Sequence, residues 1–159
     1  MVLIPLSNSI HPNPMPSLRS LLGPLLLACA GSAWAALGGN LASVQTDQLA
    51  FGASSISTSL AGGTLFTQTL PNAVVVRQYV DSAGNVYAVG WEGPVLPDFQ
   101  RLLGNSFASY QSALAQQRRG VSLQSPTLVI ESSGMMRSFV GRAYLPTQVP
   151  AAVKAQDIR

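Results

Sequence analysis

The segment 74–91 constrains the fold of this chain most, because it predicts a β-hairpin that is apolar on both of its faces. Two runs rich in β-branched and aromatic residues, 74–80 and 86–91, flank the loop 81–85, whose Asp, Ser, Gly and Asn are typical turn residues. Successive side chains of a strand point to opposite faces of a sheet. Each face of this hairpin therefore needs a cover, and a single helix can cover only one of them.

The register of the hairpin predicts a candidate binding face. Pairing Val80 with Val86 across the loop places four larger side chains on one face, namely Arg77, Tyr79, Tyr87 and Trp91. The other face holds mostly Val, Ala and Gly, against which a helix can lie closely. Two alternatives stay open for the aromatic face: residues 36–63 cover it, or it stays open to a partner. Covering is favoured, because large aromatic side chains usually end up buried.

Strand patterns recur at 64–69, 127–131 and 136–144, where β-branched and aromatic residues are again bounded by turn residues. A helical pattern, with apolar residues at three- and four-residue steps, runs from Pro97 to the Arg-Arg-Gly sequence at 118–120. The sequence therefore predicts five strands and one long amphipathic helix.

The remaining segments complete the predicted organisation. Residues 36–63 contain a short helix at 43–51 and a Gly/Ser/Thr-rich surface loop at 52–63. Short connections favour antiparallel pairing of successive strands. We therefore expect an α+β core at 64–146: a single antiparallel sheet, made of a three-strand meander plus a C-terminal hairpin, with one long helix packed on one face and a short N-terminal helix before it. Residues 147–159 are expected to be a loose C-terminal tail.

Residues 1–35 have the pattern of a signal peptide. Arg19 precedes an apolar run at 21–30, and small residues at positions 33 and 35 match the small-x-small cleavage rule. Cleavage is therefore predicted between Ala35 and Ala36, and the mature protein is expected in the periplasm or outside the cell.

Two details of this leader stay open. Met15 stands directly before the pattern and is a second candidate for the first residue. A lipoprotein signal is the alternative, in which Leu-Leu-Ala-Cys at 26–29 is a lipobox and a lipid on Cys29 anchors the protein to a membrane. The apolar run itself is short and is interrupted by Gly23 and Pro24, so it does not predict a membrane span.

Cleavage at this site would remove the one Cys and the one His of the chain. Zinc sites built on these side chains, and Ser-His-Asp or Cys-His nucleophile systems, would then be excluded, so we expect no cofactor and no metal. Charged residues make up 9% of the chain. The net charge is +3, but the basic residues are scattered rather than clustered, so no nucleic-acid partner is expected.

Carboxylates are the remaining candidates for chemistry. Glu92, Asp98 and Glu131 could serve a hydrolase in which two carboxyl groups act as acid and base across a cleft. The simpler interpretation is that Glu92 closes a strand and Asp98 serves the N-terminus of the helix. The main hypothesis is therefore a non-catalytic envelope module that binds another envelope protein or a glycan, and the carboxylate hydrolase is the alternative.

Several longer strings carry a family resemblance: ALGG at 36–39, VVVRQYVDSAGNVYAVGWEGP at 74–94, LPD at 96–98, LLG at 102–104 and MRSFVGRAY at 136–144. With these strings the chain resembles a family of small exported bacterial proteins, the domain of unknown function 2844. The resemblance implies export and a shared fold. It implies no activity and assigns no functional residue.

Overall fold

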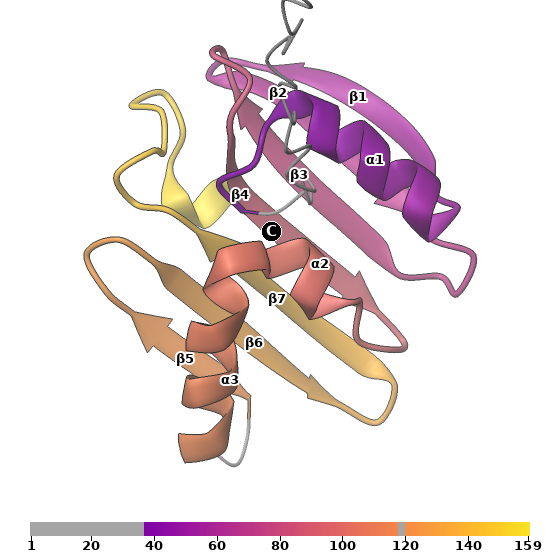
Figure 1. Cartoon of the computed structure of the whole chain (residues 1–159), viewed down its shortest axis with the longest axis vertical. Coiled ribbons are helices and arrows are strands. Elements are labelled where there is room, and N and C mark those ends of the chain that lie inside the picture. Colours follow the sequence, from indigo (N-terminus) through magenta and orange to yellow (C-terminus); the bar gives the residue numbers. More distant parts are fainter. Residues whose placement is uncertain (1–36, 118–119) are drawn as a thin grey trace, which may run out of the picture. The chain divides into compact units, whose positions relative to one another are not determined.

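The structure, a computed structural model, describes residues 37–117 and 120–159. They form an α+β fold with one antiparallel sheet of seven strands in the order β1-β2-β3-β4-β7-β6-β5 (Figure 1). The strands are β1 (Ser54–Leu60), β2 (Gly63–Thr69), β3 (Val75–Asp81), β4 (Val86–Gly93), β5 (Val121–Gln124), β6 (Val129–Met135) and β7 (Ser138–Tyr144). The helical elements are α1 (Leu41–Phe51), α2 (Phe99–Leu103), η1 (Gly104–Ser106), α3 (Phe107–Gln116) and η2 (Ala155–Asp157).

The expected fold class is confirmed as α+β with a single antiparallel sheet. The predicted hairpin at 74–91 is present as β3 and β4. The predicted signal peptide, its cleavage between Ala35 and Ala36, and Cys29 lie outside the described residues.

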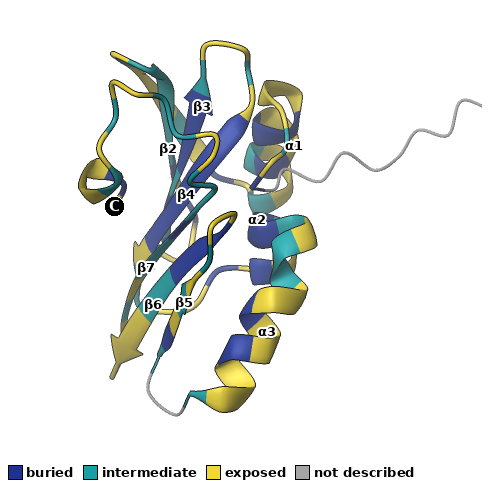
Figure 2. Ribbon diagram, turned by 90° about the vertical axis from the view of Figure 1, so that its left-hand side faces the viewer, coloured by how far each residue is buried: buried dark blue, intermediate teal, exposed yellow. Residues whose placement is uncertain are grey.

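The three α-helices lie on one face of the sheet, which we call the helix face (Figure 2). The last residues of the chain lie on the opposite face, which we call the tail face. The main hydrophobic core fills the space between the sheet and the helices, and its largest fully buried side chains include Trp91, Leu102, Leu103 and Ile130. Helix α1 begins where Asn40 caps it, since the Asn40 Oδ1 accepts a hydrogen bond from the Ser43 N–H at 3.1 Å.

The predicted surface loop at 52–63 is wrong, because most of it forms strand β1. This strand pairs with β2 in unbroken register from Ser54 opposite Thr69 to Leu60 opposite Gly63. Four of the seven residues of β1 are Ser, which is not among the residues enriched in strands, and pairing with an available neighbour decides the conformation of such a segment. The local sequence of the Ser/Thr-rich segment does not predict its pairing with β2.

The C-terminal hairpin also differs from the prediction. Strand β6 continues through the Ser-Ser-Gly sequence at 132–134, which lies between the two predicted strands 127–131 and 136–144, and the turn lies at Met136 and Arg137. Both residues have positive φ, 46° and 69°, as in the two-residue turns that usually carry Asn and Gly. Strand β5, which the sequence patterns do not indicate, pairs with β6 and forms the second edge of the sheet.

The single long helix predicted after Pro97 is divided into three pieces. Gly104 adopts φ 50° and ψ −121°, a conformation outside the helical region that is open to glycine. Helix α2 therefore ends at Leu103, and after the short η1 turn helix α3 begins at Phe107. Leu102 and Leu103 are nevertheless fully buried, so the broken helix still supplies the cover of the helix face.

The C-terminal segment 147–159, expected to be loose, packs on the sheet. Ile158 is buried and belongs to a second apolar cluster with Tyr79, Tyr87 and Ala88. A Cβ atom on Gly90 would lie 1.9 Å from the main-chain oxygen of Arg159. The absence of a side chain at Gly90 is therefore what lets the segment lie directly on β4.

Candidate functional site

A β-bulge in the β3–β4 hairpin changes which side chains share a face. Val80 pairs with Val86 as predicted, but the next pair is Tyr79 with Ala88, so β4 carries Tyr87 as an extra residue. Tyr87 and Ala88 both pack into the cluster on the tail face. Because the side-chain period of a strand is two residues, the extra residue exchanges the two faces for the rest of β4.

The predicted single patch of Arg77, Tyr79, Tyr87 and Trp91 is therefore wrong with respect to Trp91. Trp91 lies on the helix face, is only 1% exposed, and packs edge-on against Phe99 with ring centroids 4.9 Å apart. Gly141 of β7 lies directly opposite Trp91, and the small residue leaves room for the ring. Trp91 is thus a core residue of the helix face.

Tyr79 and Tyr87 do lie together on the tail face, with ring centroids 6.1 Å apart, and both are buried. Their cover is mainly the C-terminal segment rather than residues 36–63, although Leu60 packs at the margin of this cluster. The Tyr79 hydroxyl accepts a hydrogen bond from the Arg159 N–H at 3.1 Å. The aromatic part of the predicted binding face is consequently closed by the chain itself.

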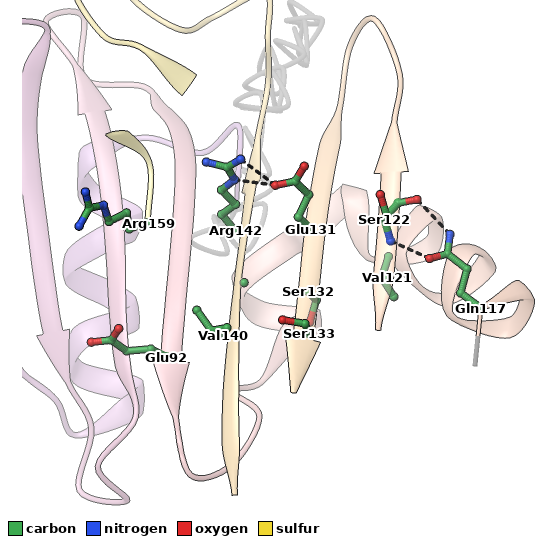
Figure 3. A pocket seen from close by; sticks show the side chains of 11 residues that line it. Glu92, Gln117, Val121, Ser122, Glu131, Ser132, Ser133, Val140, Arg142 and Arg159 are labelled. Atoms are coloured by element: carbon green, nitrogen blue, oxygen red, sulfur yellow. Dashed lines mark hydrogen bonds and ion pairs between the residues drawn. The ribbon is translucent and has the colours of Figure 1, made fainter. Parts of the chain in front are cut away.

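The other half of the tail face carries a pocket of about 590 Å³. Figure 3 shows its side chains, which come mainly from β4, β5, β6 and β7. We call it the open-face pocket, and it is lined by Glu92, Gln117, Val121, Ser122, Glu131, Ser132, Ser133, Val140, Gly141, Arg142 and Arg159. Charged groups, hydroxyls and an amide surround the half-exposed apolar side chain of Val140.

Both carboxylates of the open-face pocket are engaged by an arginine. Glu92 Oε1 accepts a hydrogen bond from Nη2 of Arg77 at 2.8 Å. Glu131 Oε2 lies 2.8 Å from Nε and 2.7 Å from Nη2 of Arg142. These are charge-assisted bonds, which fix the side chains of all four residues on the sheet.

Arg142 joins the pocket to the C-terminal segment. Its third nitrogen, Nη1, donates to the main-chain oxygens of Ala155 at 2.9 Å and Ile158 at 3.1 Å. The same guanidinium therefore holds Glu131 (Figure 3) and also binds the backbone near the end of the chain. Loss of this side chain would disturb both contacts at once.

The three carboxylates considered for a hydrolase are not brought together. Asp98 Oδ1 accepts from the Arg101 N–H at 3.1 Å and caps α2, as the simpler interpretation predicts. Glu92 and Glu131 share the pocket, but they stand on β4 and β6, on either side of β7. Two strand spacings amount to about 10 Å, and Glu92 and Glu131 are also offset along the strands, since they pair with Val140 and Arg142 of β7. Figure 3 shows the two carboxylates in different parts of the pocket.

A buried polar group that the sequence analysis does not identify lies on the inner side of α1. Asp47 is fully buried, and its Oδ2 accepts a hydrogen bond from Nε2 of Gln78 at 3.2 Å. Its Oδ1 lies 3.7 Å from Nη1 of Arg101. Burial raises the pKa of Asp47 to about 7, although Gln78 and Arg101 act in the opposite direction. The signal in the sequence is faint: Gln68 and Gln78 interrupt two otherwise apolar strand faces beneath this helix.

Across residues 37–117 and 120–159, no three Asp, Glu, His or Cys side chains gather as ligands for a metal ion. Among the helices in these same ranges, none is long and apolar enough to cross a membrane.

The described part of the chain thus defines an α+β protein with a single sheet, helices on one face, and a pocket of mixed polar and apolar lining on the other. The chain belongs to the family described as Protein of unknown function (DUF2844), which matches residues 33–158. This confirms the family resemblance drawn from the sequence. No curated protein and no solved structure matches the chain.

Proposed function

We propose that this protein is an exported, non-catalytic module that binds a glycan of the cell envelope in the open-face pocket. The observation that carries the proposal is the pocket itself: a hollow on a part of the tail face that neither a helix nor the C-terminal segment covers, with carboxylates, guanidinium groups and hydroxyls in its lining. Its volume of about 590 Å³ lies in the range of small-molecule and sugar-sized sites.

The lining of the pocket favours a glycan over a protein partner. Hot spots of protein interfaces are rich in Trp, Tyr and Arg, and of these the lining of this pocket has Arg142 and Arg159 but no aromatic residue. Its polar groups instead include both acceptors, Glu92 and Glu131, and donors, Arg142 and the hydroxyl of Ser133. Sugar hydroxyls both donate and accept, so they complement such a surface, while Val140 offers an apolar contact to a ring face.

The non-catalytic assignment is supported by the state of the two carboxylates. Each is already bound by a guanidinium, Glu92 by Arg77 and Glu131 by Arg142, and β7 stands between them. Acid–base hydrolysis needs two carboxyl groups that converge on one bond. No observation of this pocket specifically favours the hydrolase alternative. Export is supported by the signal-peptide pattern at 1–35.

Photo-crosslinking from within the pocket tests the proposal. A photoreactive residue replaces Val140, which is 49% exposed in the pocket, and in a control it replaces Leu114, which is 47% exposed on α3. We expect glycan adducts from position 140 and none from position 114 after illumination with glycan fragments released from the envelope. The variant Glu131→Gln should lower the yield at position 140. Equal adducts from both positions, or adducts with proteins alone, would overturn the proposal.

A further inference from the structure

The two edge strands of the sheet, β5 and β1, differ in whether another group of the chain bonds to their outward backbone groups. Strand β5, at one edge, has four residues, and the side-chain amide of Gln117 occupies its outer side at Ser122. The Gln117 Oε1 accepts from the Ser122 N–H at 2.7 Å, and Nε2 donates to the Ser122 main-chain oxygen at 3.0 Å (Figure 3). This amide takes the place of a neighbouring strand, which is one way in which proteins protect an edge from further pairing.

Strand β1, at the opposite edge, has seven residues and no such cover. The hydrogen bonds between neighbouring strands show which N–H and C=O groups of β1 point away from the sheet. Leu70 N–H donates to the Val74 oxygen at 2.8 Å, so even-numbered residues of β2 bond to β3 and odd-numbered ones bond to β1. The odd-numbered residues of β2 lie opposite the even-numbered residues of β1, so these even-numbered residues of β1 bond to β2. The N–H and C=O groups of Ser55, Ser57 and Ser59 therefore point away from the sheet.

Within residues 37–117 and 120–159, no side chain or backbone group bonds to these outward groups in the manner of Gln117. The edge also lacks the features that usually prevent pairing. Residues 48–76 contain no charged side chain, β1 contains no Pro, and its register with β2 has no bulge. Ile56, at the middle of the strand, is 71% exposed. The free edge is visible as the outermost strand in Figure 1.

We propose that β1 pairs with β1 of a second copy of this chain, antiparallel and with Ser57 on the two-fold axis. In this register Ser57 faces Ser57 of the second copy, and Ser55 faces Ser59. All outward groups of the strand are then used, in about six interchain hydrogen bonds, two for each closely paired set of residues.

The side chains of β1 are compatible with this register. Ser55, Ser57 and Ser59 are small and neutral, so their side chains meet across the axis without a clash or a repelled charge. Ile56 lies beside Thr58 of the second copy, so its exposed surface gains a partner. A strand that is nearly palindromic, Ser-Ile-Ser-Thr-Ser, presents the same groups to its partner in both directions.

The assembly closes at two copies. A two-fold pairing of identical edges uses both β1 strands completely, so the joined sheet ends at two β5 strands. Gln117 occupies the outer side of each β5 strand, so no third copy can add there in the same way. The structure thereby predicts a dimer with one continuous sheet rather than a filament.

Sedimentation velocity of the full chain tests the dimer. We expect the wild-type protein to sediment as a dimer whose population rises with concentration. The variant Ser57→Pro removes the outward N–H on the axis, a change that edge strands tolerate because that N–H does not bond to β2. It should sediment as a monomer with its thermal unfolding retained. The control Ser57→Thr keeps the N–H and should remain dimeric.

Disulfide trapping locates the interface independently. In a Cys29→Ser background an introduced Cys is the only one in the chain. Residues facing each other across a closely bonded antiparallel pair are about 5.5 Å apart at Cα, within disulfide range. Ser57→Cys should therefore give a covalent dimer under mild oxidation. The matched control Ser122→Cys, on the protected edge, should give none.

Three results would overturn this proposal: a wild-type chain that stays monomeric at its highest soluble concentration, a dimer that Ser57→Pro leaves intact, or trapping that is as efficient at position 122 as at position 57. If Ser57→Pro fails to fold, Ser57→Lys takes its place. Two lysines facing each other across the axis should dissociate the dimer at low salt and allow it again at high salt.

Discussion

At the scale of single residues, Asp47 is the most consequential group in this structure. It is a buried carboxylate held by Gln78, with Arg101 at 3.7 Å, beneath the helix that covers the first half of the sheet. Its Oδ1 makes no hydrogen bond in the part of the chain that the structure describes. A buried charge with incomplete hydrogen bonding is costly, and protonation relieves that cost.

Asp47 should make the free energy of unfolding fall as the pH rises. Between about pH 4 and pH 7 the unfolded chain loses the proton of Asp47 while the folded chain keeps it, because burial raises the pKa from 3.8 to about 7. About three pKa units correspond to at most ~4 kcal/mol. The variant Asp47→Asn should lack this dependence.

Urea unfolding of both proteins at several pH values measures the effect. The stability of Asp47→Asn relative to wild type should rise from pH 4 to pH 7 and then level off. Asp81, whose pKa is lowered chiefly by the backbone hydrogen bond from Asn85, is present in both proteins and cancels in the difference. A difference that does not vary with pH would show that Asp47 titrates normally.

Trp91 should behave as a core residue in solution. In a Trp34→Phe background it is the only Trp of the chain. Because it is buried against Phe99, its emission should be blue-shifted and insensitive to iodide, and Trp91→Ala should cost about 3–5 kcal/mol of stability. The exposed Leu114→Ala change is the control, and it should cost far less. Iodide quenching of the native protein would place Trp91 at the surface after all.

At the scale of elements, the C-terminal segment acts as part of the sheet's cover. It closes the tail face over Tyr79 and Tyr87, while Arg142 and Gly90 hold its backbone in place. A sheet with apolar side chains on both faces needs two covers. Here the helices supply one and the last residues of the chain supply part of the other.

The variant Ile158→Ala should show that this segment is structural. Ile158 is fully buried, so its truncation is expected to lower the free energy of unfolding by about 2–5 kcal/mol. Lys154→Ala, in the same segment but exposed, is the matched control and should change stability by no more than about 0.5 kcal/mol. Chemical denaturation measures both. Equal stabilities of the two variants would mean that the segment is loose in solution.

At the scale of the whole molecule, the predicted signal-peptide cleavage determines which residues the exported protein would contain. Cleavage after Ala35 would remove Cys29 and His11, so the exported chain would be held together by packing and hydrogen bonds without a disulfide. The family match begins at residue 33, close to this site.

Mass spectrometry of protein recovered after export should give a chain that begins at Ala36. The small residues at positions 33 and 35 are the physical basis, because the peptidase accepts only small side chains there. The variant Ala35→Arg should block this cleavage, whereas Cys29→Ser should not affect it. A mass that begins at Cys29 and includes lipid would instead establish the lipoprotein alternative.

The sequence by itself determined the features that depend on neighbouring residues. The alternating runs at 74–80 and 86–91 and the turn between them predict β3 and β4, and short connections predict antiparallel pairing. The strings shared with the family are also local, and the family is confirmed. Asp98 was expected to serve the N-terminus of the helix through the helix dipole, and it lies there as the N-cap, a contact that needs only the next three residues.

The other features of the fold and of the candidate site were decided only by the tertiary structure, because these features depend on residues far apart in the chain. Tyr79 and Arg159, which share a hydrogen bond, are 80 positions apart. The bulge at Tyr87 moves Trp91 to the helix face, and no local pattern distinguishes the two registers. The Ser/Thr-rich β1 becomes a strand only because β2 offers its edge. The open-face pocket combines four strands, so its residues had no common signal in the sequence.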